Sequence, residues 1–304
     1  MKSDQVLCAE AFVPSSMIAK AVCTHTYITF NSIRRSTMFP HGIFHAGELE
    51  FWKLGQHFQF ARMLFAIHSA SLHSLMENST VFTVVMHYDV SQAMYRKARR
   101  YRKENSKLLQ STELKGIGKS SIHMTTILRD PDTKEFLASL WYKYVYVDTT
   151  TRSSKRIPEW FLKQYDVFNP GSITPAYRGP TLPSDNSVHC KMYTFLPSDL
   201  DRNDHVNNNV YYRLFFDAAT EASVTNNLFS GFEGDICSYF VKSTSCVYEK
   251  ECRLGDLVHI LVWEDHLQAK TLQCKIVKGT ENSFQCTVVF YDQLSTMPSY
   301  KSLL

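Results

Sequence analysis

The sequence predicts an α+β chain built from two halves that share one plan. Each half begins with a strand-like run, continues with a long apolar helix pattern and ends in several strand-like runs. Strands that follow one another without intervening helices favour antiparallel sheets. Residues 166–186 separate the halves and contain a dense series of breakers: Pro170, Gly171, Pro175, Gly179, Pro180 and Pro183. This density is typical of a linker, so we expect one domain on each side of it.

The first half has an unpatterned start and a long helix. Residues 1–24 show no clear periodicity, and a turn-rich stretch covers residues 34–46. Residues 47–70 carry apolar side chains on more than one side of a helix, which is usual for a buried helix. We expect a sheet to wrap this helix, with strands at residues 25–33, 81–88, 121–128 and 136–147.

The second half repeats this order. A strand at residues 188–195 precedes a polar loop and a helix that extends to about Leu228. The helix has one apolar face, formed by residues three and four apart: Val210, Tyr211, Leu214, Phe215, Ala218, Ala219 and Ala222. Further strands are expected at residues 237–248, 257–264, 269–277 and 284–291.

The composition excludes several classes of protein. With 304 residues, 44% of them hydrophobic and 20% charged, the chain is expected to be soluble and globular. It contains no run of about 18 apolar residues, so no membrane span is predicted. None of the eight cysteines forms a Cys-x-x-Cys pair, and the first residues lack the pattern of a secretory leader. We therefore expect free thiols in the cytoplasm or an organelle, and neither a metal nor another cofactor.

The strongest charge cluster lies at residues 96–107, where Glu104 is the only acid among seven basic residues. One interpretation is an ordinary solvated face. The other is an anion dock that steers an acidic carrier protein or the phosphates of coenzyme A. RNA is a third option, but no nucleic-acid-binding motif accompanies the cluster. The candidate binding residues are Arg99, Arg100, Arg102 and Lys103.

The stretch most informative about function is residues 198–223. Polar side chains alternate at Asp199, Asp201, Asn203 and His205, directly before the second long helix. The run 207–209 supplies good N-cap residues. The unpaired N–H groups and the dipole of a helix start would stabilise an oxyanion, so Asn207 and Asn208 are candidate substrate-binding residues. The plain alternative is an Asp/Asn-rich turn that caps an amphipathic helix.

Two separated motifs resemble the acyl-acyl-carrier-protein thioesterases of plants and bacteria. The order Asp-Leu-Asp-x-Asn-x-His-Val-Asn-Asn of that family is matched by residues 199–208, and Tyr-x-x-Glu-Cys is matched by residues 248–252. The end of the first half, with a long strand, a Thr/Arg-containing turn and Ile157-Pro158-Glu159, is also similar. Two motifs in the right order are far more specific than either alone.

The resemblance implies a tandem hot-dog fold, in which two antiparallel curved sheets each wrap around a long central helix. The expected parts are an N-terminal extension (1–24), a first domain that binds the acyl chain and carrier (25–165), a linker (166–186) and a catalytic domain (187–304). The implied activity is hydrolysis of fatty acyl thioesters in fatty acid biosynthesis, with acyl carrier protein or coenzyme A as the carrier. A tandem chain already contains the pseudo-dimer of single hot-dog chains, so it is expected to be a monomer or a homodimer.

The same resemblance implies roles for individual residues. Asp201 is the candidate nucleophile or general base, Asn203 would orient the reacting groups, and His205 would share the proton transfer. Glu251 would position or activate water. Cys252 belongs to the site by resemblance, although a buried structural thiol is the simpler interpretation. Two other activities stay open: a non-catalytic acyl-binding or scaffold protein, and a hot-dog dehydratase, whose hydratase-type motif is not found.

Overall fold

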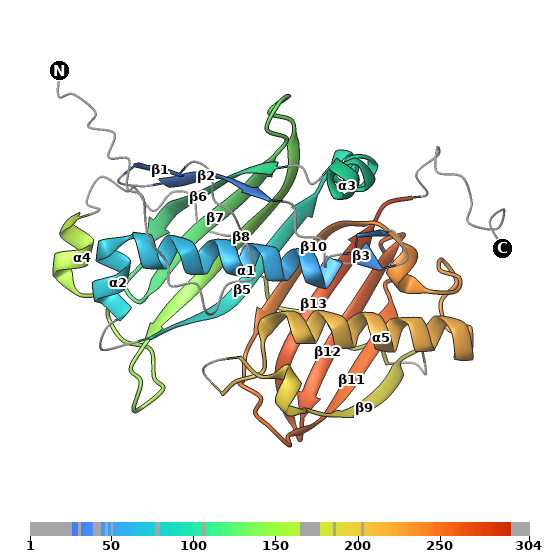
Figure 1. Cartoon of the computed structure of the whole chain (residues 1–304). Coiled ribbons are helices and arrows are strands. Elements are labelled where there is room, and N and C mark those ends of the chain that lie inside the picture. Colours follow the sequence, from blue (N-terminus) through green and yellow to red (C-terminus); the bar gives the residue numbers. More distant parts are fainter. Residues whose placement is uncertain are drawn as a thin grey trace. The chain divides into compact units, whose positions relative to one another are not determined.

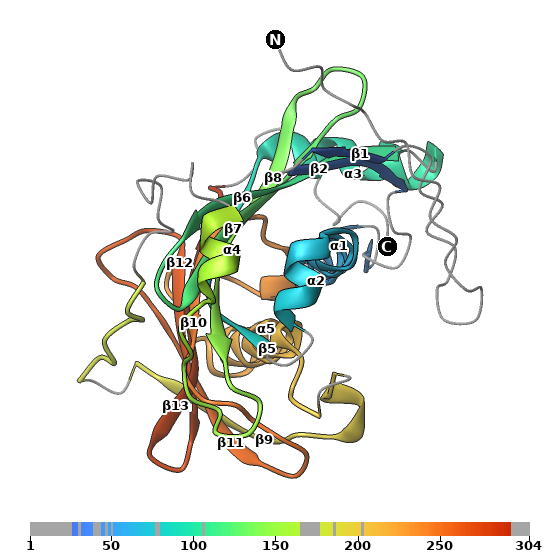
Figure 2. The same cartoon turned by 90° about the vertical axis from the view of Figure 1, so that its left-hand side faces the viewer.

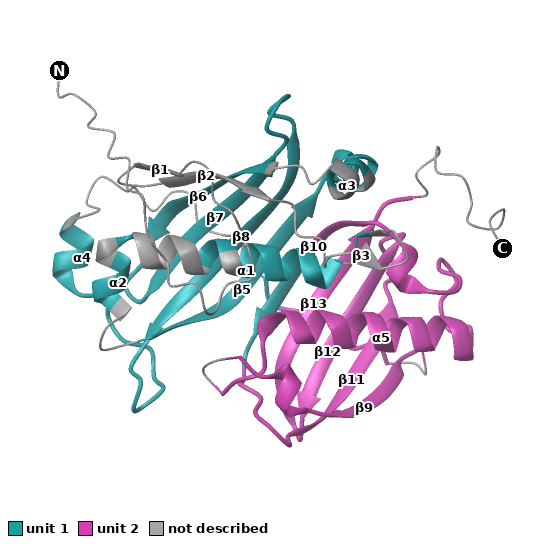
Figure 3. Ribbon diagram, viewed as in Figure 1, with its two compact units in different colours: residues 1–178, 245–249 teal, residues 179–244, 250–304 magenta. Residues whose placement is uncertain are grey.

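The computed structural model describes residues 26–29, 32–38, 44–45, 48–49, 51–76, 80–104, 107–164, 177–184, 187–201 and 204–292. The described residues belong to two compact units (Figure 3). Unit 1 comprises Met1–Arg178 and Ser245–Glu249, and unit 2 comprises Gly179–Thr244 and Lys250–Leu304. The expected extension at residues 1–24 lies outside the described residues, as does most of the expected linker. No helix in the described ranges is both long and apolar enough to cross a membrane.

The sheet of unit 1 is antiparallel, and its strands occur in the order β1-β2-β6-β7-β8-β5. The strands are β1 (Thr26–Thr29), β2 (Ser32–Met38), β5 (Thr80–Val90), β6 (Lys107–Ile117), β7 (Ser121–Arg129) and β8 (Phe136–Val147). The strands expected at residues 81–88, 121–128 and 136–147 are thereby confirmed. The strand expected at residues 25–33 occurs as β1 and the start of β2. One expectation was wrong, because residues 34–38 belong to β2 and not to a turn-rich stretch, and β6 was not predicted.

The long helix of unit 1, α1 (Phe51–His68), packs on this sheet (Figure 1). In Figure 2, which views α1 nearly end-on, β6 and β7 curve around it. Phe51 and Phe58 place their rings 5.2 and 5.8 Å from the ring of Tyr88 on β5, and all three side chains are buried. Burial of each ring stabilises this contact by about 2–3 kcal/mol. The predicted buried helix is confirmed, and it begins at Phe51 because Glu48–Leu49 form the short strand β4 with β3 (Phe44–His45).

Three shorter helices complete unit 1: α2 (Ala70–Met76), α3 (Gln92–Glu104) and α4 (Glu159–Gln164). The basic cluster lies largely on α3. This helix also has an apolar, buried stripe, formed by Met94, Ala98 and Tyr101. The density of basic residues hid this stripe from the sequence analysis.

Unit 2 has an antiparallel sheet in the order β10-β13-β12-β11-β9, with α5 (Asn208–Asn226) across it. The strands are β9 (His189–Thr194), β10 (Val241–Tyr248, of which Val241–Thr244 belong to unit 2), β11 (Leu257–Glu264), β12 (Thr271–Lys278) and β13 (Glu281–Phe290). Two 3-10 turns, η2 (Pro197–Asp199) and η3 (Ile236–Ser238), precede α5 and β10 respectively. All strands expected in the second half are confirmed, with ends shifted by a few residues.

The apolar face predicted for the second helix packs against its sheet. Tyr211 stacks on Phe284 of β13 with ring centres 5.2 Å apart. Ala218, Ala219 and Ala222 are fully buried, and their small side chains allow the helix to approach the strands closely. The helix ends at Asn227, which adopts the left-handed conformation (φ 48°) common at helix C-termini. This packing fixes the start of α5, and with it the preceding polar loop.

Candidate active site

The polar loop before α5 is anchored by Asp199, the first carboxylate of the motif. Its side chain is almost completely buried. One oxygen accepts hydrogen bonds from the Tyr193 hydroxyl and the Leu196 N–H, both at 2.8 Å. The other accepts a hydrogen bond from Arg213 of α5 at 2.8 Å. Asp199 therefore ties the loop to β9 and to the helix, a structural role that the sequence analysis did not predict.

The loop then closes on itself as a small hairpin. Leu200 and Val206 form an antiparallel bridge, and the Asp201 N–H donates to the His205 carbonyl at 2.7 Å. Asp204 turns the chain with a positive φ of 59°, a conformation that Asp tolerates better than most residues. The backbones of Asp201 and His205 therefore lie opposite each other, next to the turn at Asp204. Asn203 lies outside the described residues.

A second contact joins the loop to the Glu-Cys motif. The Val206 N–H donates to the Cys252 carbonyl at 3.0 Å, which places His205 beside Glu251 just beyond the end of β10. His205 Nε2 lies 3.3 Å from Glu251 Oε2, and the two side chains are 14% and 33% exposed. An imidazole and a carboxylate at this distance can share a proton and still reach water or a substrate.

Cys252 occupies a different environment from its neighbour. Its side chain is fully buried, and its backbone carbonyl holds the loop. Burial raises the pKa of the adjacent Tyr211, and the contact with Cys252 raises it further, so the phenol stays neutral. A buried thiol beside a neutral phenol packs as a small apolar group.

The N-terminus of α5 is capped by the side chain of Asn207. Asn207 is the N-cap, and its Oδ1 accepts hydrogen bonds from the Asn209 N–H at 2.9 Å and from the Asn209 side chain at 3.1 Å. The Asn207 N–H donates to the Asp199 carbonyl at 2.9 Å. Asn208 is the first residue of α5 and is half-buried. The N–H groups of Asn207 and Asn209 are therefore engaged in holding the loop.

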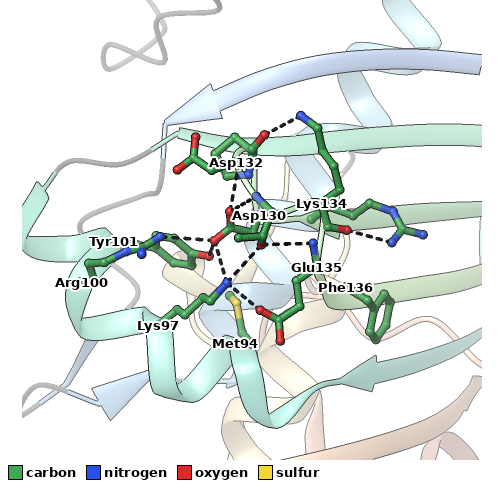
Figure 4. Close-up of polar contacts among 12 residues, drawn as sticks. Met94, Lys97, Arg100, Tyr101, Asp130, Asp132, Lys134, Glu135 and Phe136 are labelled. Carbon is green, nitrogen blue, oxygen red and sulfur yellow. Dashed lines mark hydrogen bonds and ion pairs between the residues drawn. The ribbon is translucent and has the colours of Figure 1, made fainter.

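The basic candidates on α3 lie in unit 1. Figure 4 shows the Asp130 cluster, which consists of Asp130, Lys97, Arg100, Tyr101 and the turn after β7. Asp130 Oδ2 accepts hydrogen bonds from Lys97, Arg100 and Tyr101 at 2.9, 3.3 and 2.6 Å. At least one of the four candidates, Arg100, thus contacts a buried carboxylate. The side chains of Arg99, Arg102 and Lys103 lie outside the described residues.

The described side chains include no group of three or more His, Cys, Asp or Glu residues that could hold a metal ion. The loop and the Glu-Cys motif bring together a carboxylate–imidazole pair, and the backbone of Asp201 lies opposite that of His205. Such a set can remove a proton from water and deliver it to a leaving group. Its chemistry suits hydrolysis of an activated carbonyl.

Comparison with known protein families finds a match for the part of the chain that contains this site. Residues 184–291 match the model of the acyl-ACP thioesterase C-terminal domain. No curated protein matches the chain at a significant level. This domain match covers Asp201, His205 and Glu251, and it supports acyl thioester hydrolysis.

Several solved structures share the fold over most of the chain. A protein from Lactobacillus plantarum, assigned as an oleoyl thioesterase, has 15% identity and a TM-score of 0.66, covering 85% of this chain and 95% of that one. The 12:0-ACP thioesterase from Umbellularia californica has 14% identity and a TM-score of 0.64, with 86% and 98% covered. An acyl-ACP thioesterase from Bacteroides thetaiotaomicron has 14% identity and a TM-score of 0.59, with 86% and 98% covered.

At these identities the structural likeness shows the fold alone, and it confirms the predicted tandem hot-dog architecture. The sequence match is to a single domain model, over residues 184–291, and this stretch contains the polar loop and the Glu-Cys motif.

Proposed function

We propose that the chain releases fatty acids from acyl carrier protein by hydrolysis at the Asp201–His205 loop and Glu251. The observation that carries this proposal is the 3.3 Å contact between His205 Nε2 and Glu251 Oε2. The two residues are 46 positions apart (251 − 205) and come from two separate motifs. Both stay partly exposed, as groups that exchange protons with a substrate must.

Hydrolysis requires a water oxygen to attack the thioester carbonyl and the carbon–sulfur bond to break. In our proposal the His205–Glu251 pair takes the proton from the attacking water. The same proton then passes to the departing thiolate, whose conjugate acid has an ordinary pKa near 8.5, so that it leaves readily. His205 suits this exchange because imidazole gains and loses a proton near neutral pH.

Asp201 is proposed to act from the opposite side of the hairpin. Its carboxylate either attacks the carbonyl itself, which would give an acyl-enzyme, or orients the water that His205 and Glu251 activate. Asn203, between Asp201 and His205 in the sequence, is proposed to hold the carbonyl oxygen. The buried Cys252 is proposed to be structural, because a nucleophile must reach the substrate.

The two units are proposed to have different functions. Unit 2 contains Asp201, His205 and Glu251 and is proposed to be catalytic. Unit 1 is proposed to bind the acyl chain. Residues 166–186 are proposed to link the two domains. The part of α3 formed by Arg99, Arg102 and Lys103 is proposed to attract the acidic carrier protein, since Arg100 already contacts Asp130.

The test is thiol release from medium- and long-chain acyl-CoA and acyl-carrier-protein substrates. It compares the wild type with Asp201→Ala and His205→Ala, and thermal unfolding serves as the control for folding. We expect turnover by the wild type, preference for the carrier-protein thioester and loss of activity in both variants. Activity that survives both substitutions would place the site elsewhere. Tight acyl binding without turnover on any substrate would replace the hydrolase by a non-catalytic acyl-binding protein.

A further inference from the structure

Unit 1 contains a buried arginine whose charge the candidate active site does not use. Arg62 lies in α1 and is only 6% exposed. Its guanidinium carbon is 5.2 Å from the ring centre of Tyr142 and 6.0 Å from that of Tyr144. Nη1 donates to the Thr83 hydroxyl at 3.3 Å, whereas Nε is buried and has no hydrogen-bond partner within the described part of the chain. Arg62 is thus held by aromatic groups and by neutral hydroxyls, those of Thr83 and Tyr144.

The groups around Arg62 do not balance its charge. Its principal electrostatic neighbours are the tyrosines at 144, 88, 142 and 248. Burial raises the pKa of all four hydroxyls, so they remain neutral. No carboxylate of the described residues is paired with Arg62, and a guanidinium does not lose its proton in proteins. A buried charge without a counter-charge is strongly unfavourable, which suggests that a ligand supplies the missing charge.

The sheet beneath Arg62 is also more polar than an alkyl chain alone would require. The register places Thr112 opposite Thr126, and Met124 opposite Tyr142, so these side chains share one face of the sheet. Thr112 and Thr126 are buried and hydrogen-bonded to each other at 3.0 Å. Gln110 lies on the same face, and its buried Oε1 has no hydrogen-bond partner in the described ranges. Polar groups therefore extend from β6 to Arg62.

Apolar side chains lie beside the arginine. Phe58 is one helical turn before Arg62 and therefore shares its face of α1. Phe58, Met86 and Leu140 are at most 1% exposed. An alkyl chain would find apolar contacts here, and its terminal group would meet the guanidinium.

We propose that unit 1 binds, at Arg62, a carboxylate at the end of a long alkyl chain. The planar fork of a guanidinium matches a carboxylate, and its Nε edge is the edge without a partner. Two ligands carry this chemistry: a free fatty acid, and an acyl thioester whose chain ends in a second carboxylate. This site goes beyond the proposed thioesterase reaction, because its residues are in unit 1 and its binding is measurable without turnover.

The direct test is calorimetric titration of the full chain with dodecanoate and, as an uncharged control of equal chain length, methyl dodecanoate. We expect the wild type to bind the acid at least tenfold more tightly than the ester. Arg62→Met is expected to abolish this preference, and Arg62→Lys to keep part of it. The ligand-free Arg62→Met protein is expected to unfold at the same or a higher temperature than the wild type, since it no longer buries an unbalanced charge.

A second experiment separates the two ligands. Thiol release is measured with dodecanoyl-CoA and with the CoA thioester of dodecanedioic acid. A lower KM for the dicarboxylic substrate, which Arg62→Met removes, assigns the site to a dicarboxylic acyl chain. Equal KM values together with tight dodecanoate binding assign it to a free fatty acid.

The result that overturns the proposal is equal affinity of the wild type for acid and ester. A clear fall in the unfolding temperature of Arg62→Met would then show that Arg62 is paired within the chain. His205→Ala provides the remaining control. Preference for the acid that is lost in His205→Ala and retained in Arg62→Met would assign the carboxylate to the candidate active site and reject Arg62. The proposed thioesterase reaction fails by a different readout, the absence of thiol release.

Discussion

Asp130 in unit 1 and Glu251 in unit 2 are both carboxylates beside basic side chains, yet they differ in what remains accessible. The Asp130 side chain has no exposed surface, and it accepts hydrogen bonds from Lys97, Arg100, Tyr101 and two backbone N–H groups (Figure 4). Glu251 pairs with His205, and a third of its side chain stays exposed.

This difference distinguishes a carboxylate that stabilises the fold from one that can exchange protons. A carboxylate that is buried and surrounded by donors stabilises its own turn, because its lone pairs are already engaged. A carboxylate that is half-exposed next to an imidazole can exchange a proton with water. The local density of charge in the sequence is higher around the partners of Asp130 than around Glu251, so charge density alone does not distinguish the two kinds of carboxylate.

The largest effect is expected from Glu251→Gln, which keeps the size of the side chain and removes its basicity. We expect kcat/KM for thioester hydrolysis to fall about 10²–10⁴-fold, the usual contribution of general acid–base catalysis. Thermal unfolding should change little, because the pair is partly exposed. Glu249→Gln, an exposed neighbour in the same motif, is the matched control and should retain activity. Equal losses in both variants would remove Glu251 from the proposed mechanism.

Asp130→Asn should act on stability and not on the reaction. The substitution removes the buried charge that accepts from Lys97, Arg100 and Tyr101, but Lys97 keeps its ion pair with Glu135 at 2.6 Å, so we expect a cost of about 1–3 kcal/mol. Chemical denaturation at pH 7 measures this cost. Asp132→Asn, in the same turn but exposed, should change the free energy of unfolding by less than about 0.5 kcal/mol.

The pH dependence of this difference follows from the pKa of Asp130. Burial alone would raise that pKa, but hydrogen bonds from the Thr133 N–H, Tyr101 and Lys97 hold it well below its ordinary range. The stabilisation is therefore complete above the unfolded-state pKa of about 3.9 and is lost as the pH falls through the folded-state pKa. The difference in free energy of unfolding between the wild type and Asp130→Asn should become smaller below about pH 4. A difference that stays constant down to pH 2 would contradict a charged Asp130.

Periodicity in the sequence predicted the α+β class and most of the elements, since hydrophobic patterns report which face of an element is buried, whereas the tandem hot-dog fold came from the family resemblance. The strand at 136–147 and the helix at Asn208–Asn226 were predicted from such patterns. Periodicity failed for α3, where the many basic residues in the sequence conceal the buried stripe of Met94, Ala98 and Tyr101. It also missed β6, whose polar residues Gln110 and Thr112 face the interior.

The candidate site was predicted by motif order, and the individual roles depended on three-dimensional contacts. Asp199 and Asp201 are two residues apart in one motif, yet Asp199 is buried by Arg213 and Tyr193 whereas Asp201 is half-exposed. The partners that decide this difference lie six residues earlier and 14 residues later in the chain, and no local pattern reveals them. Arg62 escaped notice for the same reason, because a single arginine within an apolar helix has no local signature.

Asp199→Asn tests whether the loop anchor affects activity through position. Loss of the charged hydrogen bond to Arg213 should lower the free energy of unfolding by about 1–3 kcal/mol. Since the loop carries Asp201 and His205, we also expect a moderate fall in kcat with an unchanged pH profile. Asp217→Asn removes the weaker 3.5 Å contact with the same arginine and is the matched control. A shifted pH profile in Asp199→Asn would instead mean that Asp199 takes part in proton transfer.

The smallest effect is expected from Cys252→Ala. The Cys252 side chain is fully buried, and its carbonyl, which holds Val206, is kept by alanine. The cost should be about 1 kcal/mol of stability, from the lost packing of one sulfur atom. Thioester hydrolysis should stay within about threefold of the wild type, since a packing change of this size leaves the His205–Glu251 pair in place. Cys274→Ala, at an equally buried position on β12, should behave alike in both measurements. If Cys252→Ala alone abolished activity, the thiol would have to reach the substrate. The comparison between buried structural groups and exposed reactive ones would then fail at the residue next to Glu251.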